Sequence, residues 1–161
     1  IIIKEIYMDF ENYLNEKFEK CLETNDLKKI KSLFNQNKKH SFNVIYGIAL
    51  AARSGNLELI NFLIKEMKKL NIKTSKENIT IGLASKYGHF DIVKLLLEET
   101  SFNPIGADNR PIQMAFENGH LNIVELLWSV EVVRKSEYSI KDSDLLKFIK
   151  SKKVQKKLKE F

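Results

Sequence analysis

The stretch AFENGHLNIVELLW at residues 115–128 decides the fold, because the chain carries two more versions of it. Residues 84–97 read ASKYGHFDIVKLLL, and residues 51–64 read AARSGNLELINFLI. The three copies begin 33 and 31 residues apart. A period of about 30–35 residues indicates stacked structural units, none of which buries its apolar face alone. Such stacks usually offer a surface to partners rather than an active site.

Each copy predicts two helices joined by a turn. A glycine ends the first helix, because glycine reaches positive φ without steric cost. These glycines are Gly55, Gly88 and Gly119. Asn56, and Asp26 in an earlier and weaker copy, are suitable N-caps for the second helix. That helix carries an apolar stripe at steps of three and four residues. The three stripes are Leu57, Ile60, Leu63 and Ile64; Phe90, Val93, Leu96 and Leu97; and Leu121, Val124, Leu127 and Trp128.

The register extends in both directions from the three copies. A diverged unit comes first, with Asn25 in place of the glycine and a matching stripe at Leu27, Ile30, Leu33 and Phe34. Apolar residues between Ile3 and Cys21 predict a long first helix that covers one end of the stack. After Trp128 the register lapses, and one or two lysine-rich helices are expected there. Terminal units need a polar outer face to stay soluble. We therefore expect one domain over residues 1–161. It comprises a helical cap at 1–24, repeats at 25–130 and a helical cap at 131–161.

Residues 110–127, RPIQMAFENGHLNIVELL, resemble the ankyrin-repeat pattern TPLHxAAxxGHxEVVxLLL. The matching positions are Pro111, Ala115, Gly119, His120, Leu121, Val124, Leu126 and Leu127. The resemblance covers about residues 45–130. It implies an all-α, ankyrin-type helix-turn-helix solenoid of about four units with helical caps. It also implies a concave binding face and projecting fingers at residues 71–78 and 102–109. The histidine of TPLH is replaced in all three copies, so the sequence does not support its hydrogen bonds between units.

The composition is that of an ordinary globular protein. The 161 residues are 43% hydrophobic and 30% charged, with a net charge of +6. No apolar run approaches the roughly 18–20 residues that span a bilayer. Ile1 is followed within a few residues by charged side chains, so no signal peptide is expected, and a first residue other than Met suggests part of a longer protein. Cys21 is the only cysteine. These features predict a monomeric intracellular domain in the cytoplasm, with the nucleus as an alternative.

The sequence offers little support for catalysis. His40, His89 and His120 are far apart, and no pair has metal-ligand spacing. Two of these histidines follow a turn glycine, where an imidazole can satisfy local backbone groups at a helix start. Cys21 falls on an apolar stripe, which favours a buried hydrophobe over a nucleophile. Phosphate-binding and nucleophile-elbow motifs are missing. We therefore expect no enzyme activity, no catalytic residue, no metal and no cofactor.

The predicted function is recognition of another protein through the concave face and the fingers. Aromatic and arginine side chains on a rigid platform are typical of interface hot spots. The finger residues expected to contact the partner are Phe42, Asn43, Lys73, Lys76, Asn109 and Arg110. The inner-helix residues expected to contact it are Arg53, Lys86, Tyr87, Glu117 and Asn118.

Two other functions stay open at this point. The lysines of residues 147–159 could neutralise phosphates, which predicts salt-sensitive binding to nucleic acid or anionic lipid. Apolar residues interleave with these lysines at helical spacing, so a cap helix with a solvated basic face explains the segment equally well. A regulatory domain attached to an enzyme outside this sequence is the third hypothesis.

Overall fold

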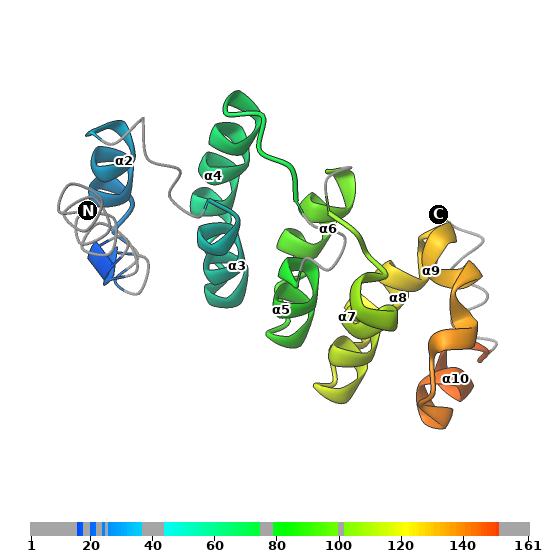
Figure 1. Cartoon of the computed structure of the whole chain (residues 1–161). Coiled ribbons are helices and arrows are strands. Elements are labelled where there is room, and N and C mark those ends of the chain that lie inside the picture. Colours follow the sequence, from blue (N-terminus) through cyan, green and yellow to red (C-terminus); the bar gives the residue numbers. More distant parts are fainter. Residues whose placement is uncertain are drawn as a thin grey trace, which may run out of the picture.

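The computed structural model describes residues 16–17, 20–21, 24, 26–36, 44–74, 79–99 and 102–151. Within these ranges every regular element is a helix, which confirms the predicted all-α class. The helices stand in a row that follows the chain from α2 to α10 (Figure 1). The row is therefore a stack in which sequence neighbours are also neighbours in space.

Three helix pairs form the body of the stack. They are α3 (Val44–Ser54) with α4 (Leu57–Lys69), α5 (Thr80–Lys86) with α6 (Phe90–Glu98), and α7 (Gly106–Glu117) with α8 (Leu121–Ser129). The first helices α3, α5 and α7 pack side by side as an inner layer, and α4, α6 and α8 follow one another as an outer layer. This arrangement confirms the helix-turn-helix units predicted from the three copies.

Shorter elements flank the three pairs. Helix α2 (Leu27–Gln36) precedes them, and its Lys31 Nζ lies 3.5 Å from Glu58 Oε1 on α4. After α8 the chain forms α9 (Glu131–Lys135), the 3₁₀-helix η1 (Glu137–Ser139) and α10 (Ser143–Ile149). Both α9 and α10 contact α8, so they cover the C-terminal end of the stack.

The turn glycines have the predicted left-handed conformation. Their φ angles are 77° at Gly55, 78° at Gly88 and 77° at Gly119. In the last turn the His120 N–H donates to the Ala115 carbonyl at 2.9 Å, and the Gly119 N–H donates to the Phe116 carbonyl at 3.0 Å. This pair of bonds is the Schellman pattern, which satisfies carbonyls left without partners at a helix end.

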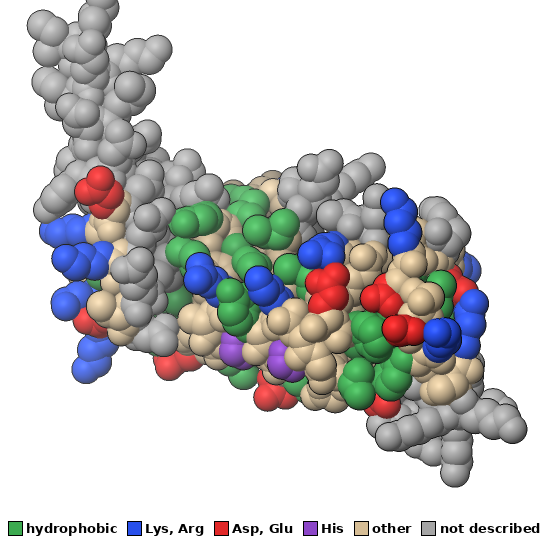
Figure 2. All heavy atoms as spheres, turned by 90° about the horizontal axis from the view of Figure 1, so that it is seen from below, with side chains coloured by type: hydrophobic (Ala, Val, Ile, Leu, Met, Phe, Trp, Pro, Cys, Tyr) green, Lys and Arg blue, Asp and Glu red, His purple; other side chains and the backbone are tan. Residues whose placement is uncertain are grey.

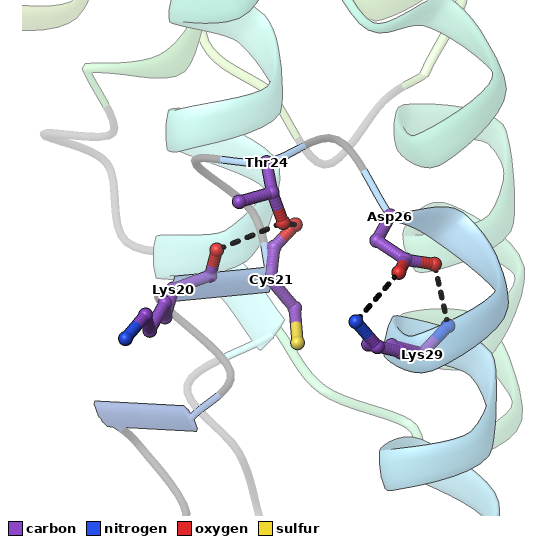
Figure 3. A network of polar contacts seen from close by, with 5 residues as sticks. All are labelled: Lys20, Cys21, Thr24, Asp26 and Lys29. Carbon is purple, nitrogen blue, oxygen red and sulfur yellow. Dashed lines mark hydrogen bonds and ion pairs between the residues drawn. The ribbon is translucent and has the colours of Figure 1, made fainter.

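The two predicted N-caps are confirmed. Asn56 Oδ1 accepts the Leu59 N–H at 2.9 Å, and Asp26 Oδ1 accepts the Lys29 N–H at 3.0 Å. The Lys29 ammonium also lies 3.2 Å from Asp26 Oδ2, so one lysine contacts both carboxylate oxygens (Figure 3). The backbone bond from Lys29, followed by its side chain, lowers the pKa of Asp26 below 3.8. The cap is therefore strongest in the ionised state.

The buried stripe of each second helix is wider than predicted. Leu59, Ile92 and Ile123 were not among the predicted stripe residues, yet they are almost fully buried. By contrast, Leu57 and Leu121 are 39% and 42% exposed, so their assignment to the buried stripe is wrong. An outer helix packs against both its own inner helix and the neighbouring outer helices, which widens its apolar face. The first residue of the helix lies at the edge of that face.

The expected finger at residues 102–109 is not a projecting loop. Phe102 is 4% exposed, and α7 already begins at Gly106. The Asn109 side chain is fully buried, and its Nδ2 donates to the Ser136 carbonyl at 2.7 Å. Asn109 thus packs against the C-terminal elements rather than extending into solvent. Asn109 is therefore structural, and its prediction as a partner-contacting residue is wrong.

Other predictions fall on residues that the structure does not describe. They include the tip of the other finger at 75–78, most of the expected first helix and the apolar residues after Ser151. Of the first helix, Cys21 is described and is buried, as predicted. The cap and repeat boundaries given above stay predictions.

Candidate functional site

Two histidines connect successive units. His89 at the start of α6 places Nε2 3.0 Å from the Arg53 carbonyl at the end of α3. His120 at the start of α8 places Nε2 3.1 Å from the Lys86 carbonyl at the end of α5. A carbonyl only accepts, so Nε2 carries the proton in both rings. The prediction that these histidines bond local backbone groups is wrong, because each ring bonds a carbonyl of the preceding unit.

The same histidines lie against the turn glycines of the preceding unit. A Cβ added to Gly55 would come within 2.6 Å of His89 Cε1, and one added to Gly88 would come within 2.6 Å of His120 Cε1. Real Cβ atoms do not approach that closely. Each of these two glycines therefore provides both a left-handed turn and room for the next unit's imidazole.

Arg53, Tyr87 and Lys86 form a cluster, here called the cation–tyrosine cluster. The Arg53 guanidinium carbon is 5.8 Å from the Tyr87 ring centroid, and Lys86 Nζ is 5.6 Å from it. Both distances are within the range of a cation–π interaction, worth roughly 0.5–1 kcal/mol at an exposed site. The structure thus brings together three of the residues predicted to contact a partner, from two adjacent units.

The cluster belongs to a surface that we call the inner face. It consists of three positions per unit, which lie nine, five and two residues before the turn glycine and share one side of the inner helix; Ile79 is the residue just before α5. Its members are Tyr46, Leu50 and Arg53; Ile79, Leu83 and Lys86; and Arg110, Met114 and Glu117. Figure 2 shows hydrophobic and basic side chains side by side on this part of the surface, next to the histidines.

Apolar residues dominate the inner face over α3 and α5. Ile79 is 62% exposed and Tyr46 is 43% exposed, although both are large hydrophobic residues. Neither residue was predicted as a contact from the sequence. Aligning the units would have revealed them, because they occupy the position that holds Arg110 in the third pair.

The α7 end of the inner face has a different character. Arg110 donates to Glu117 Oε1 at 3.0 Å, and about half of each side chain is exposed. The Asn118 side chain bends back and donates to the Met114 carbonyl at 2.8 Å. These three predicted contact residues are at the surface, but they are bonded to α7 itself. They extend the inner face without joining the cation–tyrosine cluster.

The remaining predicted contact residues are not part of the cluster. Lys73 is exposed in the segment after α4, and none of the described contacts connects it to Tyr87. Phe42, Asn43 and Lys76 lie outside the described residues.

The basic segment at residues 147–159 is described only at its start. Lys147 Nζ lies 2.9 Å from Asp144 Oδ1, and this hydrogen bond raises the pKa of Lys147 above 10.5. Lys150 pairs with Glu137. These two lysines are thus engaged with acidic groups of the fold, which favours their reading as part of a solvated cap.

The described residues contain no group of three or more His, Cys, Asp and Glu side chains placed to hold a metal ion. In the same part of the chain, none of the helices combines the length and the apolar composition that a membrane crossing requires.

Helix pairs that repeat every 31–33 residues and are joined by histidines define a helical-repeat protein. The family model described as ankyrin repeats (3 copies) matches residues 48–142, more than half of the 161 residues. The chain belongs to the ankyrin-repeat family.

The chain is also similar to leucine-rich repeat serine/threonine-protein kinase 1 of Mus musculus. The identity is 27% over 100 residues, which cover 60% of this chain and 5% of the mouse protein. The chain thus corresponds to about one-twentieth of that relative's length. No solved structure matches the chain.

Proposed function

We propose that this chain recognises a partner protein through the inner face of α3, α5 and α7. Ankyrin repeats generally serve as protein interaction modules. The observation that carries the proposal is the cation–tyrosine cluster beside exposed Tyr46 and Ile79. Tyr and Arg are enriched at interface hot spots, and a contiguous exposed apolar patch is a common mark of an interaction site.

The proposal includes the setting in which the module acts. We place it inside the cell, in the cytoplasm or the nucleus, as a monomeric domain with repeats at 25–130 and caps at 1–24 and 131–161. The single cysteine supports this setting, because Cys21 is buried among apolar residues and serves no disulfide framework.

Affinity capture from an extract of the source cells, read by quantitative mass spectrometry, tests the proposal. The bait is the full chain, compared with the double variant Tyr87→Ala with Ile79→Ala. A matched control, Leu70→Ala with Lys94→Ala, removes exposed side chains outside the inner face. We expect the partner to be retained by the wild type and the control, and to fall at least about tenfold with the inner-face variant. Equal recovery with all three baits would contradict the proposal.

Binding through the basic segment at residues 147–159 is the competing hypothesis, and it predicts a different result. If that segment were the functional site, the chain would bind polyanions with an affinity that falls steeply with salt, because counterions are released on binding. That binding would disappear on deletion of residues 150–161 and survive the inner-face substitutions. This combination would replace the proposed function with nucleic-acid or anionic-lipid binding.

A further inference from the structure

The cation–tyrosine cluster carries two positive charges, one on Arg53 and one on Lys86. Within the described residues, neither Arg53 nor Lys86 lies within ion-pair distance of a carboxylate, whereas Arg110 on the same face pairs with Glu117. Helices α3 and α5 contain no Asp or Glu at all. Among the residues that the structure describes, this part of the inner face is therefore positive, with no carboxylate within ion-pair distance of either cation.

The charges lie beside apolar surface on the same two helices. Tyr46 precedes Arg53 by seven residues, and Ile79 precedes Lys86 by seven, so each pair lies two helical turns apart on one side of its helix. The partly buried Leu50 and Leu83 lie between them. The surface thus has a basic edge near the turns and an apolar region farther along the helices.

The position of the basic edge is fixed by backbone contacts. The carbonyls of Arg53 and Lys86 accept hydrogen bonds from His89 and His120 of the following units. Both cationic groups then lie close to the Tyr87 ring centroid, Arg53 Cζ at 5.8 Å and Lys86 Nζ at 5.6 Å. These contacts fix the backbone from which the two charged side chains extend. A ligand therefore meets a largely prearranged pair of charges.

We propose that the inner face of α3 and α5 binds an acidic, apolar peptide segment of the partner protein, an inference that rests on the proposed function above. Carboxylates of the segment contact Arg53 and Lys86, and its large apolar side chains cover Tyr46, Ile79 and Leu83. The charge complementarity excludes a basic segment, because like charges facing one another across an interface are unfavourable. The peptide-binding surface ends towards α7, where the charges of Arg110 and Glu117 neutralise each other.

The apolar part of the surface favours a peptide over a nucleic acid. Phosphate binding uses basic and hydrogen-bonding groups and gains nothing from Ile79 or Leu83. A single-stranded nucleic acid could stack a base on Tyr87, so this alternative is included as an outcome of the test.

The experiment selects phage-displayed random peptides of about 12 residues on the immobilised full chain, because extended and helical peptides of that length span such a surface. The best peptides are then synthesised, and their affinities are measured by fluorescence polarisation. We expect enrichment of peptides with net negative charge and at least two large apolar residues. Arg53→Glu with Lys86→Glu should weaken them by about tenfold or more, and selection on that variant should enrich basic peptides instead.

The matched control is Lys65→Glu with Lys94→Glu, which changes the net charge equally on exposed positions of α4 and α6. It should alter affinity by no more than about twofold, because surface charges away from the contact are screened. Ile79→Ala should weaken binding while leaving the preference for acidic peptides intact. If the Lys65→Glu, Lys94→Glu control lost as much peptide affinity as the Arg53→Glu, Lys86→Glu variant, the inference would be overturned, because the effect would then be one of overall charge.

The remaining outcomes separate the inference from the proposed function. Neutral or basic peptides that still depend on Tyr87 and Ile79 would overturn the inference and leave the proposed function standing. An RNA or DNA oligonucleotide that outcompetes the peptides at the cluster would overturn both. If no peptide were enriched, or if the enriched peptides ignored every inner-face substitution, the inference would fail, and the affinity capture described above would decide the proposed function.

Discussion

Each of the glycines Gly55 and Gly88 meets two requirements, one from its own backbone and one from the next unit. A φ angle near 78° is sterically strained for any residue with a Cβ atom. The imidazole of the following unit adds a steric limit, because it occupies the space where that Cβ would lie. Gly119 shares the φ angle but has no atom within 4 Å of an added Cβ. The chain therefore contains its own control for separating the two effects.

Substitution of Gly88 by alanine should destabilise the chain more than substitution of Gly119. Gly119→Ala carries only the left-handed backbone penalty, about 1–2 kcal/mol. Gly88→Ala adds displacement of His120 and its hydrogen bond, worth a further ~0.5–1.5 kcal/mol. Urea denaturation followed by circular dichroism measures both free energies of unfolding. Equal losses would show that the imidazole moves aside without cost.

Asp26 provides a pH-dependent contribution at the start of α2. Its pKa is lowered below 3.8, chiefly by the backbone hydrogen bond from Lys29. Above that ordinary value the carboxylate is ionised in both folded and unfolded chains, and the stabilisation is fully present. It is lost as the pH falls through the lower pKa of the folded state. An NMR titration of the Asp26 carboxyl carbon should show a midpoint below 3.8, and a midpoint at or above that value would contradict the cap geometry.

The last inner helix joins the C-terminal elements through polar contacts. Besides the bond to the Ser136 carbonyl, Asn109 Nδ2 donates to Ser139 Oγ at 2.7 Å, and Asn109 Oδ1 accepts from Ser136 Oγ at 3.0 Å. Asn109 itself has a φ of 62°, which asparagine tolerates better than most residues. One side chain thus connects α7 to the turn after α9 and to η1.

Asn109→Gly should loosen the C-terminal elements without straining α7. Glycine accepts the positive φ, so the change removes only the side chain and its three hydrogen bonds. Ser136 keeps its bonds to the Val133 carbonyl and to Ser139, so the cost is that of the hydrogen bonds removed, about 0.5–1.5 kcal/mol each. Hydrogen exchange should speed up in α9 and α10 and stay unchanged in α3 and α4. Asn118→Ala, which changes the exposed asparagine just after α7, is the control and should leave α9 and α10 protected.

The difference between Gly88 and Asn109 explains what could be predicted. The turn glycines recur in every copy, so three aligned copies predict the turns, and they also predict part of the buried stripe on each outer helix. The structural role of Asn109 depends on Ser136, 27 residues away in a segment that does not repeat. No local sequence pattern predicts that contact. The candidate site lies between these cases. Arg53 and Lys86 could be found from their register, whereas the exposure of Ile79 depends on how completely the neighbouring helices cover it.

Contacts in the whole molecule run from each unit to its neighbours, since α5 contacts α3 and α7 and the outer helices contact one another in the same order. Stability in such a stack is close to a sum of unit terms and neighbour terms. The position of a destabilising substitution along the stack therefore determines how much of the molecule it affects.

Leu96→Ala and Leu145→Ala test this dependence with the same substitution at two fully buried leucines. Either change should cost about 2–5 kcal/mol locally. The α6 variant interrupts the middle of the stack, so it should lower the cooperativity of urea unfolding and reduce exchange protection on both sides. The α10 variant should affect only the C-terminal end. Indistinguishable exchange patterns would indicate a single cooperative body instead.

The open space beside Gly119 leaves room for the imidazole of one more unit. Inserting a second copy of residues 89–119 directly after Gly119 adds one full period of 31 residues. The first residue of the copy is again a histidine and takes the place of His120 against Gly88. The original His120, now one unit farther along, then meets Gly119, and the junction to α9 keeps its own sequence. The natural chain thus already contains both halves of the joint needed to extend it.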